Sequence, residues 1–121
     1  MASQNFGKAR RVRRPREYQR AFQTGIRVHG RHFTLVLVPS ERGTRLGIVA
    51  SRKLGDAVSR NRAKRLIREI FRKTDVPGPA GVDLVVIPRQ SVFAADYPTL
   101  ENDFRGALRR GVSRLKSNAA S

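Results

Sequence analysis

The stretch that most constrains the fold of this chain is SRNRAKRLIREIFR, residues 59–72. Placed at 100° per residue around a helical axis, its apolar side chains fall within a sector of about 140°, the width of a helix face that packs on a core. Its arginines gather on the opposite side, where like charges repel by about a few tenths of a kcal/mol per pair. A solvated charged face normally mixes acids with bases, but Glu69 is the one acid in this segment. The pattern therefore predicts a helix with one face anchored in the protein and the other bound to a polyanion.

The overall charge indicates the same kind of partner. A chain of 121 residues suits one domain with one modest core. Its net charge of +17 exceeds what solubility requires and predicts a phosphate-rich partner. Nucleic acid is favoured over a membrane surface because the charge is spread from Arg10 to Arg114. The chain has no cysteine and no apolar run long enough for a secretory signal or a membrane span, which favours a soluble, cytoplasmic protein.

Hydrophobic periodicity predicts an α+β fold. Helices are expected over residues 16–23, started by Pro15, over 59–73, with Asp56 or Ser59 as N-cap, and over 96–116. Strands are expected over 31–38 and 45–51, as antiparallel neighbours, and over 82–88, nearly all apolar and so central. The order α-β-β-α-β-α indicates a single-domain sandwich, a small central sheet with helices packed on it. By general rule the crossover between the second and third strands is right-handed.

Domain boundaries follow from the same reading. Residues 1–14 are predicted to be a flexible basic arm and residues 15–116 a single nucleic-acid-binding α+β domain. Residues 117–121 are predicted to be a disordered tail.

The run IVASRKLGDAVSRNRAKRLIREIFR, residues 48–72, resembles the protein component of bacterial ribonuclease P. The similarity lies in the strand that ends in Ser-Arg-Lys, the Gly-Asp-Ala-Val loop and the Arg-Asn-Arg signature that begins at Arg60. It extends downstream to the strand DLVVIPR and covers about residues 10–115.

This resemblance implies a protein subunit that assembles with a large catalytic RNA and assists the removal of the 5′ leader from precursor tRNA. The chemistry would come from the RNA, which would chiefly hold the Mg²⁺ ions, and the protein alone would be inactive. No organic cofactor and no obligate protein partner are expected. The resemblance also implies a left-handed β-α-β crossover, which replaces the right-handed expectation.

The resemblance assigns two sets of residues. The set expected to bind the catalytic RNA is Arg52, Lys53, Arg60, Asn61, Arg62, Lys64, Arg65, Arg68 and Arg72. The set expected to line a cleft for the single-stranded leader is Arg11, Tyr18, Phe22 and Val36. Exposed base faces stack on aromatic rings, which suits Tyr18 and Phe22, although Phe22 taken alone also fits a core position. Val36 stands where some family members carry an aromatic ring, so a stacking partner is missing there.

Two other functions remain open from the sequence. One is a basic structural RNA-binding protein of ribosomal type, and the other is a stand-alone metal nuclease. The nuclease is disfavoured because the nine acids are scattered, and Glu101 and Asp103 diverge on a helix. His29 and His32 are expected on opposite faces. No catalytic or metal-binding residue is predicted.

Overall fold

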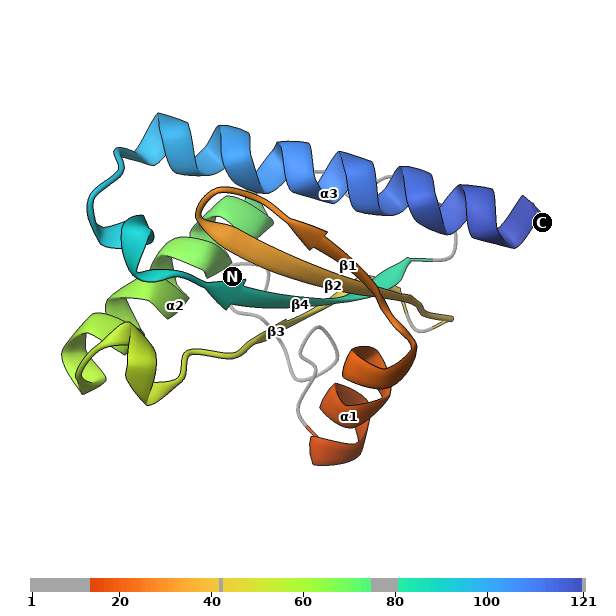
Figure 1. Ribbon diagram of the computed structural model, residues 1–121, viewed down its shortest axis with the longest axis horizontal. Helices are drawn as coiled ribbons and strands as arrows, with labels where there is room; N and C mark the ends of the chain where they lie inside the picture. Colours follow the sequence, from red (N-terminus) through yellow and green to blue (C-terminus); the bar gives the residue numbers. More distant parts are fainter. Residues whose placement is uncertain (1–13, 42, 75–80, 121) are drawn as a thin grey trace, which may run out of the picture.

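The structure is a computed structural model that describes residues 14–41, 43–74 and 81–120. The helices are α1 (Pro15–Thr24), α2 (Ala57–Arg72) and α3 (Tyr97–Ala120), and the strands are β1 (Ile26–His29), β2 (Phe33–Pro39), β3 (Arg45–Ile48) and β4 (Val82–Pro88). Two short 3₁₀ turns, η3 (Arg52–Leu54) and η4 (Gln90–Phe93), precede α2 and α3 (Figure 1). The α+β sandwich predicted from the sequence is confirmed, with one more strand, β1.

The four strands form one sheet in the order β1-β2-β4-β3. The central position predicted for β4 is confirmed, and Leu84, Val85 and Val86 are fully buried there. The predicted antiparallel pairing of segments 31–38 and 45–51 is wrong, because β4 lies between β2 and β3. Strand β4 is antiparallel to β2 and parallel to β3. Placing the most apolar strand between them buries it on both faces, which a hairpin of β2 with β3 would not do.

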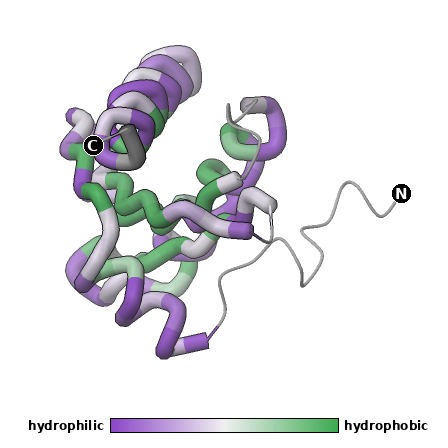
Figure 2. Tube along the Cα trace, turned by 90° about the vertical axis from the view of Figure 1, so that its right-hand side faces the viewer, coloured by the Kyte–Doolittle hydropathy of each residue, from purple (hydrophilic) through white to green (hydrophobic). Residues whose placement is uncertain are grey.

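The main core lies between one face of the sheet and the helices α2 and α3 (Figures 1 and 2). The predicted apolar sector of the basic helix is confirmed, since Ala63, Ile67, Ile70 and Phe71 are each at most 1% exposed. Asp56 is the N-cap, and its carboxylate accepts a hydrogen bond from the Ser59 amide at 2.8 Å. This contact distinguishes between the two capping residues that the sequence left open.

Helix α3 is longer than predicted. It continues to Ala120, so that residues 117–120 are helical and not the disordered tail expected from the sequence. Continuous backbone hydrogen bonding lets a helix that packs on a sheet extend past its last core residue. None of the helices in the described part of the chain is long and apolar enough to cross a bilayer.

Helix α1 packs on the opposite face of the sheet, where Ala21 joins Val36, Val38 and Val85 in a second, smaller core. Helix α2 connects the parallel strands β3 and β4 on the other side. The left hand of this crossover stays a prediction. The arrangement leaves α1 and the sheet to form one surface, and the outer side of α2 to form another.

Candidate nucleic-acid interface

The outer side of α2 carries the cationic residues that the sequence singled out. Asn61, Arg62, Arg65 and Arg72 are exposed, as are Arg52 and Lys53 on η3, while Arg60, Lys64 and Arg68 are partly buried. We call these nine residues the basic ridge. The opposite face of α2 is fixed in the core, so the basic ridge is held on a rigid support.

Few acids neutralise the basic ridge. Oε1 of Glu69 lies 3.4 Å from Nζ of Lys73 and 4.0 Å from Nη2 of Arg72. All three side chains are nearly half exposed to solvent, so these ion pairs are weak. Across the described ranges, no acidic side chain forms an ion pair with Arg65. Hydrogen bonds from the Ser59 amide and side chain lower the pKa of Asp56, with a smaller contribution from the charges of Arg60 and Arg62. At Arg65, therefore, the basic ridge presents positive charge that none of the described carboxylates neutralises.

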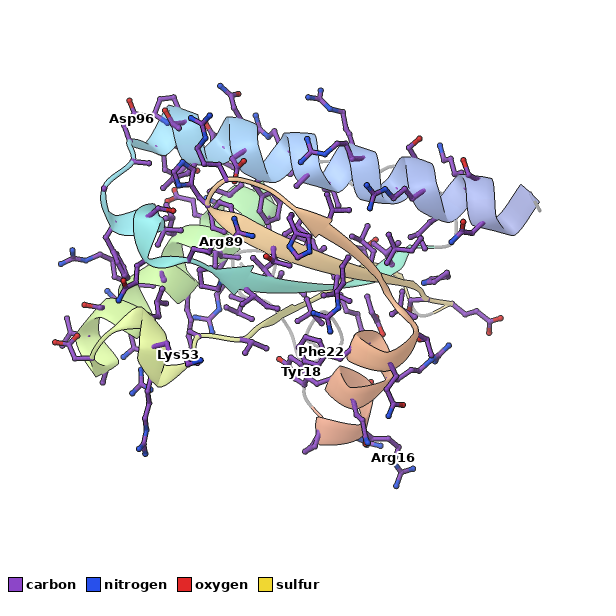
Figure 3. All side chains as sticks on the ribbon, viewed as in Figure 1. Arg16, Tyr18, Phe22, Lys53, Arg89 and Asp96 are labelled. Carbon is purple, nitrogen blue, oxygen red and sulfur yellow. The ribbon has the colours of Figure 1, made fainter. Side chains whose placement is uncertain are left out.

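The surface beside α1 carries the two aromatic rings predicted for leader binding. Tyr18 and Phe22 lie one helical turn apart and are partly buried, with Val49 and Ile87 partly buried around the same small core. We call these four residues the apolar strip. Figure 3 shows Tyr18 and Phe22 close together beside α1. Their exposed portions form a surface of the kind on which unpaired bases stack.

Val36 does not belong to the surface of the apolar strip. It is fully buried beneath α1, in the small core with Ala21 and Val85. The prediction that Val36 lines a cleft is therefore wrong, because its side chain supports α1 from below instead of facing solvent. Arg11 lies outside the described residues.

Tyr18 is held against strand β3. A Cβ atom built on Gly47 would stand 2.8 Å from the Tyr18 hydroxyl oxygen and 3.0 Å from two ring carbons, so the ring needs a glycine beneath it. Burial raises the pKa of Tyr18, and a hydrogen bond from the backbone of Ile48 partly offsets this effect. The ring is thus fixed in position while part of it remains exposed.

Cations flank the apolar strip at both ends. The Arg27 guanidinium lies 5.4 Å from the centre of the Phe22 ring, within the range of a cation–π contact. At the η3 end, Arg89 donates hydrogen bonds to the Gly30 carbonyl at 2.6 Å and to the Thr34 hydroxyl at 3.0 Å. Figure 3 shows Arg89 and Lys53 at the opposite end of the sheet from the aromatic pair.

Sequence reasoning missed Arg27, Gly47 and Arg89. Their positions depend on which strands are neighbours, and no local pattern in the sequence indicates that. For Arg89 the available signals were its position directly after the proline that ends β4 and its place at the end of the segment DLVVIPR that resembles the family. The neighbouring Gln90 donates a hydrogen bond to the Lys53 carbonyl at 3.0 Å, which joins this end of the sheet to η3.

A groove of about 1250 Å³ runs along the other flank of α1, which carries Glu17 and Arg20. It is lined by Arg14, Pro15, Arg16, Glu17, Arg20, Ala21, Val38, Pro39, Ser40, Glu41, Arg45 and Asp83. Tyr18 and Phe22 are not part of its lining. The groove and the apolar strip therefore lie on different sides of the same helix.

Several of the acids and both histidines have structural partners. Asp103 accepts hydrogen bonds from the amides of Arg31 and His32 at 2.8 Å, and Glu101 pairs with Arg105. The His32 ring is buried and lies 2.8 Å from the Ser91 hydroxyl, whereas the His29 ring is exposed. Within the described residues, no three histidine, aspartate or glutamate side chains converge as they would to hold a metal ion.

Comparison with known proteins points to one family. The family model for Ribonuclease P matches residues 6–111. The chain is 36% identical over 107 residues to the ribonuclease P protein component of Finegoldia magna, covering 88% of this chain and 95% of that protein. It is 38% identical over 113 residues to the same component of Chromohalobacter salexigens, covering 91% and 88%.

Solved structures agree with the sequence matches. The fold is similar to that of the RNase P protein from Thermotoga maritima, with a TM-score of 0.74 and 34% identity, over 83% of this chain and 96% of that chain. It is also similar to the Staphylococcus aureus RNase P protein, with a TM-score of 0.73 and 33% identity, over 84% and 94%.

Proposed function

Because the chain belongs to the ribonuclease P protein family, we propose that it binds the catalytic RNA of ribonuclease P through the basic ridge and the single-stranded 5′ leader of precursor tRNA through the apolar strip. In this role it assists the endonucleolytic cut that produces the mature 5′ end of the tRNA. The RNA carries out the chemistry, and the protein supplies binding.

The observation that carries the proposal is that α2 is buried on one side and exposes arginines on the other. On one side of α2, four apolar residues are each at most 1% exposed in the core: Ala63, Ile67, Ile70 and Phe71. On the other side, Arg62, Arg65 and Arg72 are exposed. Folding requires only the first of these faces. A row of like charges on the second is relieved when RNA phosphates lie against it and their counterions are released.

The apolar strip supports a role in leader binding. Stacking on an aromatic ring contributes about 1–3 kcal/mol per base and depends little on base identity. Tyr18 and Phe22 offer two rings on one rigid helix, and Arg27 lies close enough to Phe22 to meet the phosphate of a stacked nucleotide. A leader of variable sequence would suit such a site.

Magnesium ions would be held chiefly by the RNA. The described carboxylates fit this assignment, because Asp56 caps a helix, Asp83 pairs with Arg45 and Asp103 caps a turn. When bound, the ions would activate the attacking water and stabilise the leaving oxygen. The protein's part is to hold the two RNAs. As part of the same proposal, the protein works in the cytoplasm, together with the catalytic RNA and precursor tRNA.

The alternative of a basic structural protein of the ribosomal type is less well supported. A protein that only fills crevices in RNA has no use for aromatic side chains held at a partly open surface. Here Tyr18 is fixed on Gly47, and the exposed part of the ring has no such structural explanation.

Reconstitution tests the proposal. Purified protein is mixed with precursor tRNA and Mg²⁺, with and without the catalytic RNA, at an RNA concentration and ionic strength where the RNA alone is slow. We expect cleavage at the mature 5′ end to be accelerated only when both are present. Cleavage by the protein alone would favour a nuclease, and RNA binding without acceleration would favour a structural protein.

A further inference from the structure

Arg45 is a buried cation that joins two elements of the fold. It is 8% exposed. Its Nη1 atom lies 2.7 Å from Oε2 of Glu17, and its Nε and Nη2 atoms lie 2.8 and 2.7 Å from the two carboxylate oxygens of Asp83. One guanidinium therefore bridges a carboxylate on α1 and a carboxylate on β4.

The two contacts of Arg45, with Asp83 and with Glu17, form for different structural reasons. Arg45 and Asp83 face each other in the register of the parallel strands β3 and β4, so the sheet itself brings them together. Glu17 comes from a helix that packs on the sheet, and no strand pairing places it there. The contact between Arg45 and Glu17 thus connects α1 to the sheet.

Both carboxylates raise the pKa of Arg45. The hydrogen bonds to Asp83 are the largest cause, burial opposes them in part, and the hydrogen bond to Glu17 makes a smaller contribution. A buried cation that loses one of two carboxylates is left poorly compensated, as is the carboxylate that it leaves. The fork of the guanidinium suits simultaneous contact with both acids, which a lysine ammonium cannot reproduce.

Glu17 is adjacent to Tyr18 and links the start of α1 to the sheet. Its Oε1 atom accepts a hydrogen bond from the Arg14 amide at 3.2 Å, so one carboxylate both caps the helix and holds Arg45. Because neighbouring residues of a helix move together, a shift of Glu17 would move the Tyr18 ring over Gly47.

We propose that Arg45 is a positioning residue for leader binding, which fixes α1 over the sheet through Glu17 and thereby holds the Tyr18 and Phe22 rings of the apolar strip in place above the sheet. This inference rests on the proposed function. Arg45 touches no RNA in this account, since its charge is already satisfied by Glu17 and Asp83.

The test uses Glu17→Gln in the reconstituted holoenzyme. Glutamine has one acceptor oxygen, so it can hold either the Arg14 amide or Arg45, and it carries no charge. The pair between Arg45 and Asp83 stays intact. We measure the leader advantage, defined as the affinity for precursor tRNA divided by the affinity for leaderless tRNA.

For Glu17→Gln we expect the leader advantage to fall about tenfold. Affinity of the protein for the catalytic RNA and the cleavage rate at saturating precursor should remain at the wild-type level, so that KM rises and kcat does not. A purely structural role would lower thermal stability without this selective rise in KM.

Control variants distinguish loss of the Glu17 contact from loss of any ion pair. Glu101→Gln also removes a charge and an ion pair, with Arg105 on α3, and should leave the leader advantage unchanged. Arg45→Lys should retain more of the leader advantage than Arg45→Met. If Arg45→Met does not fold, Glu17→Gln still decides the question, because it leaves the sheet pair in place.

The outcomes separate this inference from the proposed function. If the wild-type protein shows a leader advantage that Tyr18→Ala reduces but Glu17→Gln does not, the positioning role of Arg45 is overturned and the proposed function stands. If the wild-type protein shows no leader advantage at all, both are overturned.

Discussion

Tyr18 on α1 lies against Gly47 on β3 so closely that a single added methyl group would stand 2.8 Å from the tyrosine hydroxyl oxygen. The two residues are far apart in the sequence, and their contact sets how the aromatic ring sits above the sheet. The glycine is required here for space and not for a special backbone conformation, since its φ is not positive.

Gly47→Ala should displace the Tyr18 ring. We expect a loss of about 1 kcal/mol in leader-dependent affinity, near the lower end of the value of one stacked base. Binding to the catalytic RNA should not change, because α2 packs on the other face of the sheet. Titration of the holoenzyme with precursor and leaderless tRNA measures the effect. An unchanged leader advantage would show that the position of the ring does not matter.

Arg65→Ala combined with Arg68→Ala should flatten the salt dependence of binding to the catalytic RNA. Each phosphate contact that is lost lowers the slope of log K against log salt by about 0.7–0.9, so a decrease of about one to two is expected. The matched control is Arg109→Ala with Arg110→Ala, which removes the same charge from exposed positions of α3. Equal changes in slope for the two double variants would argue against a specific role for the basic ridge.

The two glycines of α3 should respond in opposite directions to alanine. At Gly106 the nearest atom to an added Cβ is on the flexible Arg110 side chain at 3.5 Å, so Gly106→Ala should stabilise the fold by about 0.8–1 kcal/mol. At Gly111 the added Cβ would stand 2.6 Å from the buried side chain of Leu37, so Gly111→Ala should destabilise it by about 1–3 kcal/mol. Urea denaturation measures both changes, and stabilisation by Gly111→Ala would show that α3 does not pack as closely as described.

The cap of α2 should make part of the stability depend on pH. The hydrogen bonds from Ser59 lower the pKa of Asp56 in the folded protein. Because this pKa is lowered, ionised Asp56 stabilises the fold at pH values above its unfolded-state pKa. This stabilisation is lost as the pH falls through the folded-state pKa. Asp56→Ala should therefore lower the thermal midpoint at neutral pH, by an amount that shrinks in acid. Asp56→Asn keeps a capping oxygen that does not titrate. The difference between its thermal midpoint and that of wild type should therefore become smaller as the pH falls.

Patterns within single elements predicted much of this fold. The apolar sector of α2 and the buried run of β4 each lie within one continuous segment, so periodicity and composition were enough to place Ile67 and Val85 in cores. Strand β1 was missed because it has four residues, of which Arg27 and His29 are exposed. Its weak pattern becomes a strand only through pairing with β2.

Relationships between elements were not predictable in the same way. The short link before β3 suggested a hairpin, but burial of β4 on both faces separated β2 from β3. The alternation of side chains along β2 places Val36 on the α1 side of the sheet, but the sequence does not show that α1 covers this position. The bridge from Glu17 through Arg45 to Asp83 joins three elements, and only the folded chain brings them together.

The basic ridge and the apolar strip should act as separate binding surfaces, and this separation can be measured. Affinity for the catalytic RNA and the leader advantage are both measured for wild type, for Tyr18→Ala and for Arg65→Ala with Arg68→Ala. We expect Tyr18→Ala to lose about 1–3 kcal/mol of leader-dependent affinity and to keep its affinity for the catalytic RNA. For the arginine variant we expect a loss of affinity for the catalytic RNA and an unchanged leader advantage. A result in which either variant lowers both quantities equally would contradict this separation.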